Sequence, residues 1–212
     1  MNKKEFFIEL KNQSVPNRYT FCLPIGNPIE AIIRPIPTSK VNSQSVDVKL
    51  LTEWRNKYVK SFLTEFVATE KQTAHWLKEI VHPNESKILL MVELLDGTAV
   101  GHIGLGFINW DESYGEADAI VSNGASPKGL MKQSLIALLR WAHYELGLNN
   151  LCVRVRSDNP AIEFYKKVGF IEFKRVGLKC NQTEGNLNWS EDINLKDPLV
   201  SLVYMDYDCS LL

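Results

Sequence analysis

A run of small residues at positions 122–131 carries the clearest chemistry in the sequence. It reads Ser-Asn-Gly-Ala-Ser-Pro-Lys-Gly-Leu-Met and separates an alternating apolar run from a long helical one. Backbone amides at the start of a helix have no partner within the helix, and the positive end of the helix dipole attracts anions. Gly129 permits close approach and Lys128 adds positive charge. The run predicts a phosphate-binding turn, with a plain strand-to-helix connection as the alternative.

Two carboxylates precede this turn by a few residues. Glu116 and Asp118 are two positions apart, so in a strand both face the same side. The alternation places Tyr114, Glu116, Asp118 and Ile120 on one face, and Ala117, Ala119 and Val121 on the other. Such a pair could supply a general base, and the competing interpretation is a solvated or salt-bridged pair.

The hydrophobic pattern predicts the elements that position these groups. Strands are expected at 29–36, 87–95, 98–108, 114–122, 150–156, 170–178 and 199–207. Helices are expected at 46–63, 69–81, 130–146 and 160–168, and a polar loop at about 181–197. This order predicts an α+β fold with a mixed, largely antiparallel sheet flanked by helices. We expect residues 1–28 to form an N-terminal extension and residues 29–212 a single domain.

Residues 122–131 and 157–170 together resemble two motifs of the GCN5-related N-acetyltransferase (GNAT) family. The family's acetyl-CoA loop reads Arg/Gln-x-x-Gly-x-Gly/Ala, and its later segment reads roughly Asn-x-x-Ala-x-x-x-Tyr-x-x-x-Gly-Phe. The matching positions are Lys128, Gly129, Tyr165, Gly169 and Phe170. The resemblance covers about residues 29–178.

Some positions depart from these motifs. Ser126 stands where Arg or Gln is usual, and Met131 where Gly or Ala is usual, although Gly-Leu-Met is similar to the ribosomal-protein acetyltransferase branch. The spacing from Asn159 to Ala161 is one residue short, which leaves open whether Asp158 or Asn159 fills the family's asparagine position.

The resemblance implies acetyl-CoA as cosubstrate, with no metal. It assigns the cofactor to Val121, Ser122, Asn123, Ser126, Pro127, Lys128, Gly129, Leu130, Met131, Asn159 and Tyr165. The strand end at Val121 would pair with the pantetheine arm as an added strand does. Tyr165 would protonate the leaving thiolate. Glu116 is the first candidate for the general base and Asp118 the second, with ordered water as the alternative.

The acceptor is less defined by the sequence. Trp54-Arg55-Asn56 resembles a signature of ribosomal-protein and nucleotide-amino-sugar acetyltransferases, and His102 is the one histidine expected in the substrate cleft. We expect a small-molecule amine, such as a nucleotide-linked amino sugar. A peptide amine, as in ribosomal-protein acetylation, is the alternative acceptor. A third hypothesis is a protein that binds acetyl-CoA without catalysis.

Composition excludes other classes of partner. The 212 residues include 24 Lys and Arg against 25 Asp and Glu, and this balance argues against nucleic acid or an anionic membrane as partner. The four cysteines lack metal-ligand spacing, so reduced, mostly buried thiols are expected. Charges interrupt the apolar stretch near the N-terminus, which argues against a signal peptide and for a cytoplasmic protein. A homodimer is compatible with these features.

Overall fold

The fold is seen in a computed structural model, which describes residues 3–12, 21–183 and 185–212. Within these residues the helices are α1 (Lys3–Asn12), α2 (Val46–Lys57), α3 (Glu70–Trp76), α4 (Leu130–Tyr144) and α5 (Ala161–Val168). The strands are β1 (Leu23–Ile25), β2 (Ala31–Pro35), β3 (Thr64–Glu65), β4 (Ile88–Leu94), β5 (Ala99–Asn109), β6 (Tyr114–Ser122), β7 (Asn150–Arg156), β8 (Phe170–Thr183), β9 (Asn186–Glu191) and β10 (Ser201–Tyr207).

The strands form one mixed sheet in the order β1-β2-β4-β5-β6-β7-β10-β8-β9-β3. Neighbouring strands are antiparallel except β6 and β7, which run parallel. This arrangement confirms the predicted α+β class. β6 and β7 pair only where residues 114–116 face residues 150–152. Beyond these residues the two strands have no pairing with each other, so the sheet opens between them.

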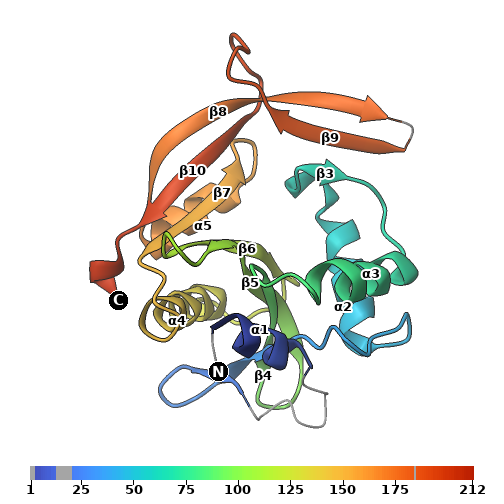
Figure 1. Cartoon of the computed structure of the whole chain (residues 1–212), viewed down its shortest axis with the longest axis vertical. Coiled ribbons are helices and arrows are strands. Elements are labelled where there is room, and N and C mark those ends of the chain that lie inside the picture. Colours follow the sequence, from blue (N-terminus) through green and yellow to red (C-terminus); the bar gives the residue numbers. More distant parts are fainter. Residues whose placement is uncertain (1–2, 13–20, 184) are drawn as a thin grey trace.

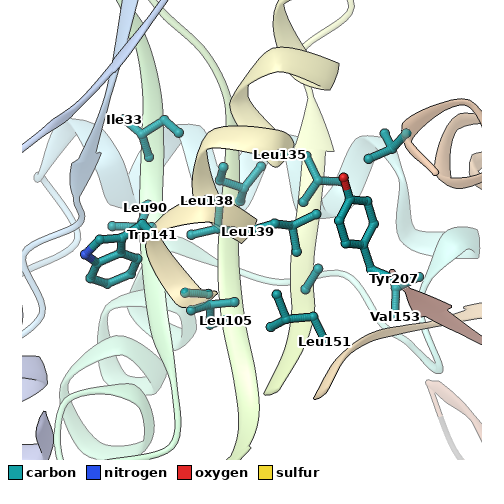
Figure 2. Packing of buried hydrophobic residues seen from close by; sticks show 14 of the residues in the cluster. Ile33, Leu90, Leu105, Leu135, Leu138, Leu139, Trp141, Leu151, Val153 and Tyr207 are labelled. Carbon is teal, nitrogen blue, oxygen red and sulfur yellow. The ribbon is translucent and has the colours of Figure 1, made fainter. Parts of the chain in front are cut away.

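Helices cover both faces of the sheet, and each face has its own hydrophobic core (Figure 1). On the first, here called the α4 face, α1, α4 and α5 bury residues such as Leu138 against Leu105 and Leu151 of the strands (Figure 2). On the second, here called the α2 face, α2 and α3 bury Leu51 and Ala74 against the strands. The opening between β6 and β7 therefore connects two differently covered sides.

The predicted boundaries of β6 and β7 agree with the structure, and two other predictions need correction. The helix expected at 46–63 ends at Lys57 and gives way to a 3-10 turn, Val59–Ser61, because the chain turns back to form β3. The loop expected at 181–197 contains the end of β8 and all of β9. The end of β8 and β9 are largely exposed, so no apolar alternation marks these residues in the sequence.

A β-bulge interrupts β6 near its middle. The register with β5 shifts between His102 and Gly104, and Ala119 has φ +51°, a conformation that costs energy for a residue with a Cβ. The extra residue reverses the alternation that follows it. Ala119 packs with the core of the α2 face and Ile120 with the core of the α4 face, so the prediction that Ile120 shares a face with Asp118 is wrong.

The described part of the N-terminal extension, residues 3–12 and 21–28, includes a helix that is joined to the core. α1 buries Phe7 and Leu10 in the core of the α4 face. Lys11 is fully buried, and its ammonium donates to the carbonyl oxygens of Val81 (3.1 Å), Asn84 (2.6 Å) and Lys87 (3.2 Å). Burial lowers the pKa of Lys11 to about 8, although the charge of Glu85 opposes this shift.

A buried ion-pair cluster attaches α2 to the sheet. Arg34 of β2 donates from Nη1 and Nη2 to both carboxylate oxygens of Asp47 at 2.8 Å, and from Nε to Glu93 of β4 at 2.7 Å. All three residues are at most 6% exposed. Because removing one member of such a cluster leaves a buried charge unpaired, the cluster specifies where α2 lies on the sheet.

The cysteines are mostly accessible. Cys22, Cys152, Cys180 and Cys209 are all free thiols, but only Cys152 is buried, so the prediction of mostly buried thiols is wrong. Cys180 is exposed because it lies on the uncovered β8–β9 hairpin.

None of the helices in the described ranges is long and apolar enough to cross a membrane.

Candidate active site

Tyr165 lies on α5, in the core of the α4 face. It is 7% exposed, and its ring makes edge contacts with Phe164 and Phe170. Burial raises the pKa of the Tyr165 hydroxyl well above its ordinary value, and the negative charge of Asp118 raises it further. Because α5 lies on the α4 face and Asp118 on the α2 face, this interaction crosses the sheet. The phenol is therefore protonated at neutral pH.

The turn between β6 and α4 presents unpaired backbone amides. The amide of Leu130 donates to Pro127 O and that of Gln133 to Gly129 O. The amides of Lys128, Gly129, Met131 and Lys132 donate to no other described residue. Gly129 has φ +87°, and a Cβ placed there would meet no atom within 4 Å. The turn therefore has both the donors and the open space that a phosphate group needs.

The start of this turn is held on both sides. The amide of Asn123 donates to Val100 O at 3.0 Å, and its side-chain oxygen accepts from the amide of Ala125 at 2.8 Å. Lys57, at the end of α2, donates to Asn123 O at 2.8 Å. Ser126 is half-buried beside Pro127. These contacts preorganise the turn without using the amides that follow it.

The remaining residues assigned to the cofactor lie around the same opening. Val121 is buried on the α2 face and pairs with His102, while Ser122 pairs with Gly101, so β6 keeps its other backbone edge unpaired. Leu130 is buried in the core. Met131 packs over Gly101, whose missing side chain makes room for it.

The residues before α5 act on local structure. Asn159 accepts from the amide of Ala161 at 2.9 Å, one residue before the Pro160 N-cap of α5, and it also donates to Ser61 O at 3.4 Å. Asp158 forms an ion pair with Arg156 instead. Asn159 therefore joins α5 to the turn after α2.

Glu116 is buried and has both carboxylate oxygens engaged. Oε1 accepts from the hydroxyl of Tyr114 at 2.7 Å, and Oε2 accepts from Nε of Arg154 at 2.7 Å. Burial raises the pKa of Tyr114 far above its ordinary range, with the hydrogen bond to Glu116 as the next cause. Arg154 is on β7, so this ion pair crosses between the strands where they begin to separate.

Asp118 forms an ion pair with Lys87 and is partly accessible. Its side chain is 27% exposed and that of Lys87 is 19% exposed. Gly106 on β5 faces it so closely that a Cβ there would lie 2.7 Å from Oδ2 of Asp118. Sequence reasoning missed Lys87, because the residue lies 31 positions from Asp118 and only the pairing of β4, β5 and β6 brings the two together.

His102 lies beneath the β6 bulge and is 6% exposed. Its ring stacks on Trp54 at a centroid distance of 5.9 Å. Burial lowers the pKa of His102 to about 4, although a hydrogen bond to the Ala119 backbone and the charge of Asp118 oppose the shift. The imidazole is therefore neutral at physiological pH and supports the bulge.

The Trp54-Arg55-Asn56 signature organises the chain after α2. Arg55 donates to Thr64 O at 2.6 Å and stacks on the rings of Phe62 and Phe66. Asn56 exchanges two hydrogen bonds with the backbone of Ala68, at 2.8 and 2.9 Å. The structure thus places Trp54 and His102 together below the β6 bulge, whereas Arg55 and Asn56 contact residues 62–68.

Arg154 and Arg156 were not selected from the sequence. Arg156 forms ion pairs with Glu65 and Asp158 and stacks on Trp189 of β9. Both arginines alternate with the apolar residues of β7, so they share the α2 face. That alternation could have indicated them, because two arginines on one face of a central strand require acidic partners on the same face.

Histidine, cysteine and acidic side chains form no group of three or more suited to a metal ion within the residues that the structure describes.

Comparison with known proteins identifies the family. The model of the acetyltransferase (GNAT) domain matches residues 40–171. No curated protein gives a significant match to the sequence. The fold is similar to the crystal structure of a probable acetyltransferase, with TM-score 0.63, 15% identity and coverage of 88% of this chain and 96% of that one.

Spermidine acetyltransferases are also among the similar structures. Spermidine N-acetyltransferase from Vibrio cholerae, in complex with CoA and spermine, has TM-score 0.65 and 17% identity, with 86% of this chain and 99% of that chain covered. The enzyme of the same organism with manganese ions has TM-score 0.59 and 17% identity, with 86% and 95% covered. At such identities the likeness establishes the fold. The domain match covers more than half of the sequence, and the chain therefore belongs to the GNAT acetyltransferase family and is an N-acetyltransferase.

Proposed function

We propose that this protein transfers the acetyl group of acetyl-CoA to the primary amine of a small molecule, by direct attack within a ternary complex. The observation that carries the proposal is the opening between β6 and β7. The phenol of Tyr165 on one face and the carboxylate of Asp118 on the other interact electrostatically across the sheet, and the free edge of β6 leads to a turn with unpaired amides. These groups suit a donor, a base and an anionic cofactor in that order.

The turn and the free edge of β6 would hold the cofactor. The amides of Gly129, Met131 and Lys132 would bind the pyrophosphate, with the charge of Lys128 nearby. The unpaired backbone edge from residue 117 to residue 122 would hydrogen-bond the pantetheine arm as an additional strand would. Bound acetyl-CoA supplies an acetyl thioester with a thiolate leaving group.

Tyr165 would act as the general acid. Its hydroxyl would donate a proton to the sulfur as the thiolate leaves, and the raised pKa keeps that proton available at neutral pH. Since the edge contacts with Phe164 and Phe170 restrain the ring, the hydroxyl is held in one direction.

Asp118 is the better placed of the two carboxylates to accept the proton of the amine. Glu116 already accepts from Tyr114 and Arg154 through both of its oxygens, whereas Asp118 has one charged partner and remains partly accessible. Glu116 would then orient Arg154. A proton relay through ordered water is the competing arrangement.

A small acceptor fits the shape of the α2 face. The β8–β9 hairpin extends over this side and β9 pairs with β3, while Trp189 donates to Glu65 at 2.8 Å (Figure 1). A peptide acceptor requires an open groove, so this cover favours a small molecule. An amino sugar carried on a nucleotide is the first class to test, and a peptide N-terminus the second.

Thermal shift with acetyl-CoA, CoA and an amine panel tests the proposal. A ligand at 100 times its Kd adds about 2.7 kcal/mol to the stability of the protein. We expect acetyl-CoA to stabilise the protein and an amine to release free CoA thiol, with the acetylated product identified by mass spectrometry. Stabilisation without thiol release on any amine would favour the non-catalytic reading, and no stabilisation would contradict the proposal.

A further inference from the structure

Two ion pairs lie side by side on the α2 face at the base of the opening. Lys87 pairs with Asp118, and Arg154 pairs with Glu116. The two carboxylates lie two residues apart on β6. Each has its own cation, which comes from the residue before β4 in one case and from β7 in the other. The base of the opening is consequently neutral, with positive groups at its margins.

The next carboxylates on this face also have a cationic partner, although one guanidinium balances only one of their two negative charges. Glu65 and Asp158 both pair with Arg156, at 2.6 and 2.7 Å. A polyamine requires carboxylates that are free to pair with each of its ammonium groups. A second ammonium placed beside Arg154, Arg156 or Lys87 would be opposed by the repulsion of like charges.

Two aromatic rings hold the Arg154 guanidinium in place. Its guanidinium lies over the ring of Phe107 at 4.2 Å and 5.9 Å from the centroid of Tyr204. Phe107 is 59% exposed and has φ +52°, a backbone conformation that is costly for a bulky residue. Costly conformations that persist in a fold concentrate at functional sites.

The Arg154 guanidinium also has donors to spare. Of its five N–H groups, the one on Nε is used by Glu116, and Tyr204 offers a single hydroxyl. The side chain is 21% exposed, so the remaining donors can reach a ligand. A planar guanidinium with free donors suits a carboxylate or a phosphate, which it binds through paired hydrogen bonds.

We propose that the acceptor carries an anionic group, a carboxylate or a phosphate, in addition to its reactive amine, and that Arg154 binds this anion while the amine lies at Asp118. The inference rests on the proposed acetyl transfer and narrows its substrate to amines of no net positive charge.

Four acceptors with the same six-carbon chain test it: 6-aminohexanoate, 6-aminohexyl phosphate, hexylamine and 1,6-diaminohexane. Their length suits the roughly 7 Å that separates alternate residues on a strand. We would measure kcat/KM from released CoA thiol, and the melting-temperature shift of the CoA-loaded protein as a measure of binding independent of turnover. We expect one or both anionic amines to exceed 1,6-diaminohexane by about tenfold or more. The better anionic probe distinguishes a carboxylate from a phosphate.

Arg154→Lys is the informative variant, because it keeps a cation beside Glu116 but loses the paired donors. The ratio of kcat/KM for the better anionic amine over hexylamine should fall by about tenfold. Lys174→Gln is the matched control. It removes an exposed cation that contacts the same Tyr204 ring from 4.7 Å, and it should leave the ratio unchanged.

Three results would overturn the inference. These are equal or better use of 1,6-diaminohexane, a ratio unaffected by Arg154→Lys, and the absence of both turnover and melting shift with either anionic amine. If acetyl-CoA stabilises the protein in these cases, the proposed acetyl transfer still stands. If acetyl-CoA does not stabilise it, the proposed function fails first.

Discussion

Lys87 and Asp118 form an ion pair at the opening between β6 and β7, although 31 residues separate them in the chain. The pair leaves Asp118 partly accessible, whereas Glu116, two residues earlier, is enclosed by Tyr114 and Arg154. The two carboxylates of β6 therefore differ in what they can do.

Asp118→Asn should lower kcat about 100-fold, because the amide cannot accept the proton of the amine. The Kd of acetyl-CoA, measured by calorimetry, should stay within about twofold. Glu116→Gln is the matched comparison, since its amide oxygen can still accept from Arg154 or Tyr114. A loss of kcat in Glu116→Gln as large as that in Asp118→Asn would transfer the role of base to Glu116.

Tyr165→Phe should lower kcat by about 100-fold or more, the typical contribution of a positioned proton donor. The ring contacts with Phe164 and Phe170 persist in the variant, so acetyl-CoA binding and melting temperature should change little. Steady-state turnover at saturating acetyl-CoA provides the measurement. Turnover within about a factor of two of the wild type would show that Tyr165 is not the acid.

Gly129→Ala should weaken acetyl-CoA binding by about tenfold, because the new methyl group enters the space that the phosphate needs. The left-handed backbone adds a folding cost of about 1 kcal/mol. Gly185→Ala separates the two effects: Gly185 has φ +77° with equally open surroundings, but it lies in the β8–β9 turn. Calorimetric titration of both variants should show weaker binding in Gly129→Ala alone.

The stability of the protein should fall as the pH is lowered from 6.5 to 4, in part through His102. Above pH 6.5 the imidazole is neutral in both the folded and the unfolded state. Between the ordinary value of 6.5 and the folded pKa of about 4, only the unfolded chain binds the proton, and this favours unfolding.

His102→Gln should therefore flatten the pH dependence of the unfolding free energy over this range, by an amount on the order of 3 kcal/mol. Denaturant titrations at several pH values measure the slope. His75→Gln, at an exposed position, is the control and should retain the slope of the wild type. An unchanged slope in His102→Gln would mean that His102 is not the group responsible.

Local pattern was enough to predict much of the framework. The alternation of β7 and the apolar face of α4 marked these elements within a residue or two, and the Gly129 turn and Tyr165 followed from their motifs. Other features depend on contacts between distant segments. The β6 bulge changes the face of Ile120, and β9 is defined by its pairing with β3 rather than by hydrophobicity.

The candidate site likewise contains residues that the sequence predicts and residues that it does not. Its backbone donors and its phenol were predictable, because each depends on a few consecutive residues. The cations that pair with the two β6 carboxylates were not, since Lys87 and Arg154 reach them only when the strands pair. A sequence shows which carboxylates share a face, but the charge of that face depends on the assembled sheet.

The carbonyl contacts of Lys11 extend this dependence to the start of the chain. One of the three oxygens that its ammonium binds is that of Lys87, whose side chain pairs with Asp118. The first helix thus restrains the backbone that presents a cation to the proposed base. Docking of residues 3–12 therefore contributes to the arrangement of the proposed site, because Lys11 contacts the backbone of Lys87.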